Sequence, residues 1–575
     1  MKRYWKYIRP YIQYYILGPC FMMMEVVGDV LLPYMLAKII NQGIAERNVV
    51  YIIKIGVIMG FIAVIMAVSG VLGAWFASKA AMNFGADLRM DLFEKIQQFS
   101  FQNIDNFSTG SLITRLTNDI TQIQNMIMMT LRMCLRSPGI LIGAMVMAFV
   151  ISPKLAAIFI IVLPVLAVLI VVIMRRAFPQ FRTLQEKLDA LNSCIQEGLV
   201  GIRLIKSFVR GDYEEMRFEK RNQQLKEANL TAMKTMLLYT PLMTLALNIT
   251  TVVVVWSGGN MIVAGNMQVG DLTAFTNYIV QIMSSLTMLS IAFLNWARAI
   301  ASFRRVGEVL DEKIDLTDEN AKHKDRAVCE GSVEFQNVSF RYYKNSPEWV
   351  IENISFKLEA GKTLGIIGST GSGKSTLVSM IPRLYDTDEG TVLIDGINVR
   401  DYGLKPLREG IGMVLQNNTL FSGSITENLK WGDEHADEKA VRKAAQNAQA
   451  AGFIDSFKDG YRTHLEQSGN NVSGGQKQRL CIARALLKCP KILILDDSTS
   501  AVDTATERAI REALHSEYKN MTKIIIAQRI RSVMDADEIL VLDNGKTAGF
   551  GTHEQLLADC PVYREIYDVQ NGREE

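Results

Sequence analysis

The stretch TLGIIGSTGSGKST, residues 363–376, decides the fold of the second half of the chain. An apolar strand pattern runs into the spacing G-x-x-x-x-G-K-S, and a helical pattern follows, which is the context of a phosphate-binding loop. Glycines let the backbone wrap around phosphates, while backbone amides and the helix N-terminus supply positive potential. The sequence therefore predicts a nucleotide-phosphate site formed by Gly368, Ser369, Thr370, Gly371, Ser372, Gly373, Lys374, Ser375 and Thr376.

A second apolar run, ILIL at 492–495, ends at Asp496 and Asp497. A carboxylate at the end of such a strand is placed to hold Mg²⁺ together with the hydroxyl of Ser375, while Lys374 should reach the β- and γ-phosphates. Short apolar runs alternate with helical stretches around both motifs, so we expect an α/β domain with buried parallel strands. ATP and Mg²⁺ are the expected cofactors.

The first half of the chain consists mainly of long apolar stretches separated by charged segments. Six apolar stretches are long enough to cross a bilayer, at about 14–42, 51–80, 129–150, 154–177, 238–265 and 272–297. Basic residues before the first stretch and after the fourth and sixth predict that both termini are cytoplasmic. The long charged segments 81–128 and 178–237 should be cytoplasmic extensions of these helices. The expected location is the plasma membrane of a bacterium, as a multi-pass protein.

The composition changes near residue 305, where a polar linker begins. We therefore expect an α-helical transmembrane domain at 1–310 with an N-terminal elbow helix, a linker at 311–330, and the nucleotide-binding domain at 331–575. A net charge of only +3 argues against a nucleic-acid partner. The seven scattered cysteines show neither zinc spacing nor a disulfide framework.

The stretch VSGGQKQRLCIARAL, residues 472–486, resembles the signature of ATP-binding cassette (ABC) proteins. The resemblance covers the whole chain, because six spans followed by one cassette is the layout of an ABC exporter half-transporter with the type I fold. The segment 107–119 also looks like the family's first intracellular loop. Soluble ABC proteins lack the spans, and importers usually carry membrane and cassette domains on separate chains, so neither alternative fits.

The resemblance implies further roles at the nucleotide site. In the family, ATP is held between the phosphate loop of one cassette and the signature of another, here Ser473, Gly474, Gly475 and Gln476. Tyr342 resembles the aromatic side chain that stacks on adenine. Gln416 resembles the Q-loop glutamine, which senses Mg²⁺, and Asp503 closes a D-loop at 500–503.

Three positions depart from the family pattern, and two of them belong to the hydrolytic centre. Asp497 stands where the family usually has a glutamate that acts as general base, and its carboxylate lies roughly 1.5 Å further back. A misplacement of about 1 Å can cost on the order of 100-fold in rate. Gln528 stands where a switch histidine is usual, and glutamine cannot become cationic. Gln467, just before the signature, also replaces a usual glutamate.

Two changes at the hydrolytic centre, beside an intact phosphate loop and signature, resemble one chain of a heterodimeric exporter with one degenerate ATP site. A second ABC half-transporter is then the expected partner, and its ATP would be hydrolysed against the signature of this chain. The alternatives are a slow homodimeric exporter of lipid or peptide, and a regulatory or ATP-gated subunit without useful hydrolysis.

Glu25 and Asp29 are candidates for the transport path of an amphiphilic small molecule, with multidrug export as the expected activity. They lie four residues apart in the first span, hence on one helical face. Carboxylates at membrane depth are costly and usually face a cavity or a partner. They could serve a cationic cargo or a proton-linked step, or equally a packing contact or a gate.

The segment SFVRGDYEEMRF, residues 207–218, resembles the family's second coupling helix, which docks into the opposite cassette. Arg210 and Asp212 suit a polar interface, and Tyr213 offers an aromatic anchor for a groove. The alternative is a solvated helical turn.

Overall fold

The computed structural model describes residues 2–344, 346–498 and 500–570, without the side chains of 2, 290, 291, 293–295, 297 and 298. Contacts within the chain define two units, one formed by 1–96 and 110–311 and the other by 97–109 and 312–575. The predicted domain boundaries near 310 and 330 stay a prediction. The short segment 97–109 packs with the second unit, which the sequence did not indicate.

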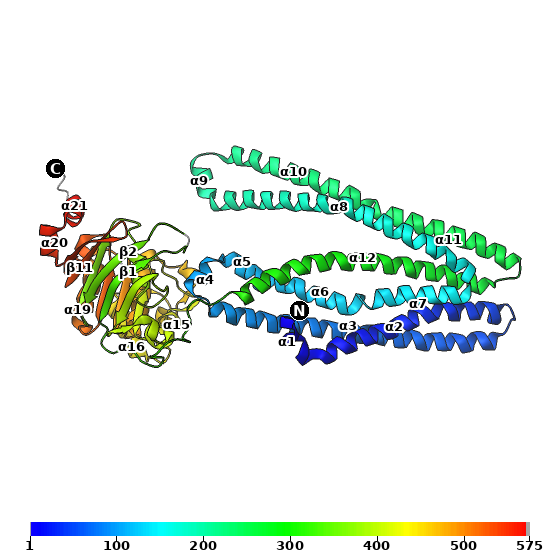
Figure 1. Cartoon of the computed structure of the whole chain (residues 1–575), viewed down its shortest axis with the longest axis horizontal. Coiled ribbons are helices and arrows are strands. Elements are labelled where there is room, and N and C mark those ends of the chain that lie inside the picture. Colours follow the sequence, from blue (N-terminus) through cyan, green and yellow to red (C-terminus); the bar gives the residue numbers. More distant parts are fainter. Residues whose placement is uncertain (1, 345, 499, 571–575) are drawn as a thin grey trace. The chain divides into compact units, whose positions relative to one another are not determined.

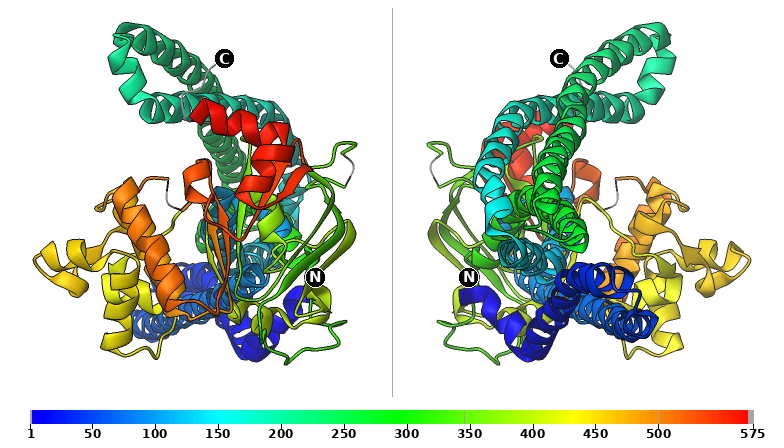
Figure 2. Two further views of the ribbon diagram at one scale, coloured as in Figure 1. Left: turned by 90° about the vertical axis from the view of Figure 1, so that its left-hand side faces the viewer. Right: turned by 90° about the vertical axis from the view of Figure 1, so that its right-hand side faces the viewer.

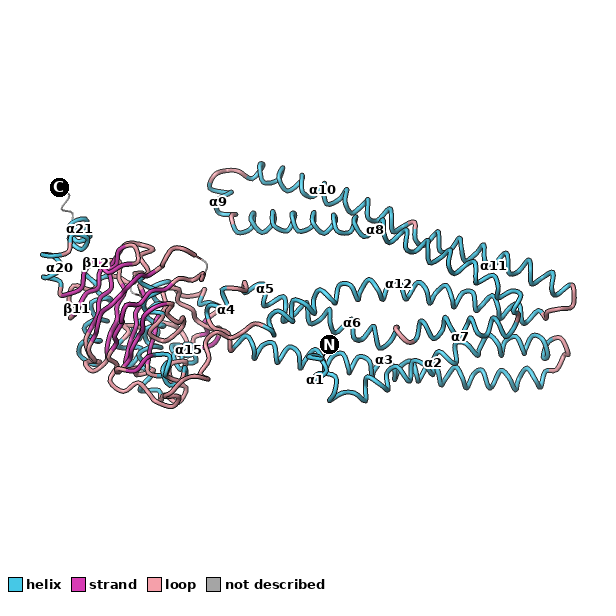
Figure 3. The backbone as a smooth tube through the Cα atoms, viewed as in Figure 1, coloured by secondary structure: helices cyan, strands magenta, loops and turns pink. Residues whose placement is uncertain are grey.

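The first unit is built from helices alone (Figures 1 and 3). Its helices are α1 (Trp5–Ile8), α2 (Ile12–Lys38), α3 (Val49–Gln97), α5 (Thr109–Thr114), α6 (Ile120–Met133), α7 (Arg136–Ile151), α8 (Pro153–Val200), α9 (Ile202–Ser207), α10 (Gly211–Leu237), α11 (Tyr239–Val263) and α12 (Val269–Asp311). Helix α8 packs against α10 and α11, which are the teal and green helices in Figure 2.

Among the described residues, five helical segments are long and apolar enough to cross a membrane: Trp5–Ile44, Val49–Gln97, Thr109–Ile151, Pro153–Val200 and Gly211–Val263. The sixth predicted span falls on α12, which contains residues whose side chains are not described. Spans two and four continue without a break into their predicted extensions, as α3 and α8. The third predicted span is interrupted, because α6 ends at Met133 and α7 begins at Arg136.

Local sequence explains where α8 begins, and packing explains how the helices meet. The hydroxyl of Ser152 accepts from the Leu155 amide, and Pro153 takes the first helical position, where its missing N–H costs nothing. Phe159 stacks on Phe275 with 5.5 Å between ring centroids. The hydroxyl of Tyr278, buried in α12, donates to the Val30 carbonyl at 2.8 Å and so ties α12 to α2.

The second unit is an α/β domain with two larger sheets. Its strands are β1 (Val333–Phe340), β2 (Ile351–Leu358), β3 (Thr363–Gly368), β4 (Glu389–Ile394), β5 (Ile397–Asn398), β6 (Ile411–Val414), β7 (Gly423–Ser424), β8 (His464–Leu465), β9 (Ile492–Asp496), β10 (Thr522–Ile526), β11 (Glu538–Asp543) and β12 (Lys546–Gly551). Its helices are α4 (Phe101–Asp105), α13 (Lys374–Ser379), α14 (Leu404–Glu409), α15 (Ile425–Lys430), α16 (Glu438–Asn447), α17 (Ala451–Ser456), α18 (Gly474–Leu487), α19 (Thr504–Glu517), α20 (His553–Asp559) and α21 (Pro561–Gln570).

The six-stranded sheet has the order β12-β11-β3-β10-β9-β6, and only β12 runs antiparallel to its neighbour. Every residue of β9 is buried, as expected for a central parallel strand covered on both faces. Residue 526 of β10 lies level with residue 366 of β3 and with residue 496 of β9. The carboxyl ends of these three strands therefore meet at one edge, where ligands bind in such folds.

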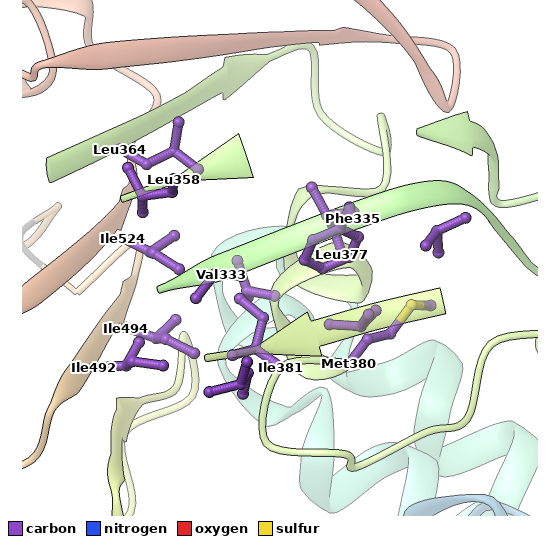
Figure 4. Close-up of a cluster of buried hydrophobic side chains, with 14 of the residues drawn as sticks. Val333, Phe335, Leu358, Leu364, Leu377, Met380, Ile381, Ile492, Ile494 and Ile524 are labelled. Atoms are coloured by element: carbon purple, nitrogen blue, oxygen red, sulfur yellow. The ribbon is translucent and has the colours of Figure 1, made fainter. Parts of the chain in front are cut away.

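The second sheet, β2-β1-β4-β5, is antiparallel and shares a core with the first. Phe335 stacks on Phe356 at 4.7 Å between centroids, and side chains of β3, β9 and β10 pack against both sheets and α13. Figure 4 shows this cluster, which contains Val333, Phe335, Leu358, Leu364, Leu377, Met380, Ile381, Ile492, Ile494 and Ile524. The core holds the phosphate loop between rigid elements.

Candidate functional site

The predicted phosphate loop connects β3 to α13. Gly371 and Gly373 have φ of +87° and +91°, a left-handed backbone that glycine adopts without strain. A β-carbon on Gly373 would lie 2.7 Å from Ile351 Cγ2 and 2.9 Å from the Val350 carbonyl, so a larger residue would not fit. The glycines of the sequence pattern are therefore required by the backbone itself.

Lys374 is the first residue of α13, and its side chain curls back over the loop. Its ammonium donates to the carbonyls of Gly368 at 2.9 Å and Ser369 at 2.7 Å. Burial lowers the pKa of Lys374, while Asp496 and Asp497 nearby oppose that shift. A lysine held in this way carries its positive charge into the loop, where it can meet the charge of a phosphate group.

Ser375 and Asp496 come together from α13 and β9. The Ser375 hydroxyl donates to the Asp496 carboxylate at 3.0 Å, and burial raises the pKa of Asp496. Both line a cavity of about 210 Å³ that also contacts Gln416, Asp497 and Gln528. Hydroxyl, amide and carboxylate oxygens are ligands that Mg²⁺ prefers. The donor set thus fits Mg²⁺ held by Ser375, Asp496 and Gln416, where the ion would offset phosphate charge.

The two residues of the hydrolytic centre that depart from the family pattern, Asp497 and Gln528, contact each other. The Gln528 side-chain amide donates to the Asp497 carboxylate with 2.8 Å between Nε2 and Oδ2. Burial raises the pKa of Asp497, and the hydrogen bond from Gln528 opposes that shift. The backbone of Asp497 is left-handed, with φ of +47°, a conformation that aspartate tolerates better than most residues. The backbone at 497 thus favours a short polar side chain.

Tyr342 lies beside the loop and is joined to a residue that sequence reasoning missed. Its hydroxyl lies 2.9 Å from that of Thr376, and its ring meets Tyr385 edge-on at 5.3 Å. Tyr385 in turn donates to Asp105 of α4 at 3.0 Å and contacts the Phe101 ring. The segment 97–109 is therefore connected to the phosphate loop through two tyrosines. No local pattern marks Tyr385, because its partner lies 280 residues earlier.

The signature forms the N-terminus of α18, as the sequence predicts. The Ser473 hydroxyl accepts from the Gln476 amide and the Gln476 side chain accepts from the Ser473 amide, which closes a capping box. Gly474 and Gly475 follow as the first two helical residues. None of these four described residues lines the phosphate-loop cavity. The capping box uses the amides of Ser473 and Gln476, which leaves the amides of Gly474 and Gly475 at the helix N-terminus for another ligand.

The D-loop packs against the signature helix. A β-carbon on Gly475 would lie 2.8 Å from the Ala501 carbonyl, and the Gln478 side chain accepts from the Ala501 amide at 3.1 Å. Asp503 caps α19 by accepting from the Thr506 amide, and hydrogen bonds from Thr506 lower the pKa of Asp503. The signature and the D-loop therefore form one connected surface.

Glu25 and Asp29 share a partner that the sequence analysis did not identify. One guanidinium nitrogen of Arg136 lies 2.9 Å from Glu25 and 3.1 Å from Asp29. All three side chains are largely buried, and Arg136 is the first residue of α7, directly after the break in the third span. Gln281 of α12 also donates to the Asp29 carbonyl. The cluster joins α2, α7 and α12 and has a net charge of −1.

The proposed coupling residues lie at the exposed turn between α9 and α10. The Arg210 guanidinium lies over the Tyr213 ring, 5.8 Å from its centroid. Tyr213 is 54% exposed, and Val209 beside it is 88% exposed. Asp212 lies in the first turn of α10, where a carboxylate favours the helix N-terminus. Arg210, Asp212 and Tyr213 therefore belong to one accessible surface.

A phosphate loop, a strand-end aspartate and a capped glycine-rich helix, on a chain with membrane-length helices, define a membrane transporter driven by ATP. Two family models agree: the ABC transporter transmembrane region matches residues 15–286, and the ABC transporter model matches residues 351–500. The chain belongs to the ABC transporter family, and its cassette couples ATP to transport.

Relatives match along the whole chain. YfiB of Bacillus subtilis, an uncharacterized ABC transporter ATP-binding protein, is 39% identical over 100% of this chain and 99% of its own length. YgaD of the same organism, named as a candidate multidrug export ATP-binding/permease protein, is 33% identical over 99% of both chains. A bacterial Atm1-family ABC exporter with ATP bound has the same fold, with a TM-score of 0.81, 24% identity and 98% coverage of both chains.

Proposed function

We propose that this chain is one half of a heterodimeric ABC exporter, in which its own nucleotide site binds ATP but hydrolyses it slowly. The hydrogen bond between Gln528 and Asp497 carries this proposal. A general base must direct a carboxylate oxygen at the attacking water, within hydrogen-bond reach. Here one oxygen of a shortened carboxylate already accepts from an amide that cannot donate a proton to the reaction.

The signature supports the other half of the proposal. Its capping box and the two glycines that begin the helix match what a phosphate-binding helix terminus requires. An intact signature beside a weakened general base is useful when it completes the site of a different cassette. The signature residues 473–476 would then contact the ATP bound by the partner. The ATP bound by this chain would be hydrolysed only slowly and so would hold the two cassettes together.

The proposed cargo is an amphiphilic small molecule. YgaD, which is named as a candidate multidrug export protein, supports this class. The net negative charge of the Glu25–Asp29–Arg136 cluster favours cationic over anionic molecules near α2. The exposed turn at 207–213 would transmit cassette closure to these helices by docking into the partner's cassette.

The ATPase activity of this chain alone, compared with its activity beside a second half-transporter, tests the proposal. The partner to use is one with glutamate and histidine at the positions of Asp497 and Gln528. We expect turnover of the pair to exceed that of this chain alone at least about 10-fold, since only the pair contains a complete general base. Equal turnover would support a slow homodimer, and absence of hydrolysis in both would support a regulatory subunit.

A further inference from the structure

A second cavity, of about 750 Å³, lies in the second unit and shares no residue with the phosphate-loop cavity. Its walls are one face of α19, the start of β10 and the segment 531–536. Its charged lining residues are Arg508, Arg511, Lys523 and Arg531 as cations and Glu512 and Asp535 as anions, with His515 beside them. Four cations face two carboxylates, so the lining has a net charge of about +2.

Lys523 is the most unusual of these residues. It is only 3% exposed, yet within the described residues its ammonium has neither an ion-pair nor a hydrogen-bond partner. The nearby Asp537 carboxylate instead accepts from the Thr363 amide at 2.7 Å. Burial lowers the pKa of Lys523, with Asp537 opposing the shift. The side chain is buried and no partner in the described part of the chain neutralises its charge, so this position favours an anion.

Arg511 adds a second buried donor to the same cavity. Its Nη1 donates to the Arg531 carbonyl at 2.7 Å and lies 3.3 Å from Asp535, which holds the guanidinium plane in place. Its Nε is buried and has no partner. A guanidinium held in a fixed orientation is well suited to the oxygens of a phosphate or carboxylate. Lys523 of β10 and Arg511 of α19 thus bring two cationic donors from different elements to one cavity.

We propose that this cavity binds a small phosphorylated anion, distinct from the ATP of the phosphate loop, with Lys523 and Arg511 as its main donors. The volume lies within the range of small-molecule sites, roughly 300–1,000 Å³. An excess of two positive charges suits a di- or trivalent anion, and Arg508 at the rim can contact an extended ligand.

Occupancy of this cavity would act on the nucleotide site through its walls. Thr504, which lines the cavity, directly follows Asp503 of the D-loop. Arg531 follows Gln528 by three residues. Lys523 lies at the start of β10, and Gln528 comes two residues after the end of this strand. A bound anion would hold these segments in one position, so it would change the rate of ATP hydrolysis in the assembled transporter.

Binding of inorganic pyrophosphate to the purified full chain, measured by calorimetry, tests the proposal. The measurement uses the Lys374→Ala variant, because this substitution removes the main contact that pyrophosphate could make with the phosphate loop. In this background we expect one pyrophosphate per chain, with affinity reduced about 10-fold or more by Lys523→Met, because a charge-assisted hydrogen bond is lost. The exposed Lys519 serves as the control, and Lys519→Met should leave the affinity unchanged.

A second variant guards against misfolding of the Lys523→Met chain. Arg508 is exposed, and Arg508→Gln should reduce the affinity roughly 3-fold without affecting folding. The proposal is wrong if the Lys374→Ala chain binds no pyrophosphate. It is equally wrong if the folded variants at 508 and 523 bind as tightly as the Lys519→Met control, since the anion then lies elsewhere.

Discussion

Gln528 donates a hydrogen bond to Asp497 across 2.8 Å, so the two substituted residues of the hydrolytic centre are occupied with each other. The nucleotide site of this chain is then expected to contribute little to turnover. Asp497→Asn should lower the ATPase rate of the assembled exporter less than about 2-fold, because the competent general base lies in the partner's site. Steady-state phosphate release measures the rate.

The Lys374→Ala variant is the comparison for Asp497→Asn, because it removes ATP binding rather than the general base. It should abolish ATP binding at this chain's own site while some hydrolysis continues at the other, as measured by nucleotide binding and phosphate release. Loss of nearly all activity in the Asp497→Asn complex would contradict a degenerate site.

The signature should matter more than Asp497. Ser473→Ala removes the capping box of α18, and losing such a cap costs helix stability of about 1 kcal/mol. We expect ATP hydrolysis by the assembled exporter to fall further than with Asp497→Asn, because Ser473 helps to complete the competent site. Ser516→Ala on α19 is the matched control. Equal losses for Ser473→Ala and Asp497→Asn would indicate a symmetric homodimer.

Tyr385 is expected to link nucleotide binding to the segment 97–109. Tyr385→Phe keeps the ring contact with Tyr342 but removes the hydrogen bond to Asp105, worth about 1 kcal/mol. ATP affinity should stay within about 2-fold of wild type, because the affected bond lies away from the phosphate loop. Stimulation of ATPase activity by cargo should decrease. Tyr343→Phe, at an exposed position, is the control, and equal stimulation in both variants would contradict the link.

The Glu25–Asp29–Arg136 cluster should be sensitive to the loss of its single cation. Arg136→Met leaves two carboxylates without a partner, which costs about 3–5 kcal/mol for a buried pair. Thermal unfolding in detergent should show this loss, and adding Glu25→Gln with Asp29→Asn should restore most of it. If the restored chain still exports a cationic dye, the carboxylates only pack; if export is lost, they contact the cargo.

Tyr213→Ala should lower transport while ATP affinity stays nearly unchanged, since Tyr213 is exposed at the tip of the helices and far along the chain from the phosphate loop. Dye export and nucleotide binding measure the two effects, with Lys220→Ala on α10 as the control. A cysteine at 213 should crosslink to the Q-loop region of the partner's cassette. Crosslinking to this chain's own Q-loop would contradict the crossed arrangement.

The sequence alone determined the features that depend on neighbouring residues. The phosphate loop is one of them, because Gly371 and Gly373 are needed for a left-handed backbone whatever surrounds them. The capped start of α18 and the apolar strand β9 are others, since capping and burial follow patterns of a few residues. The membrane-length helices were equally evident from their long apolar runs.

Only the tertiary structure decided which distant side chains meet. The pairing of Arg136 with Glu25 and Asp29 joins residues more than 100 positions apart, and Tyr385 meets Asp105 across 280. The contact of Gln528 with Asp497 and the buried position of Lys523 depend on how parallel strands are ordered in the sheet. Such contacts have no periodic signal along the chain, because they arise from packing between elements rather than from the backbone preferences of any one of them.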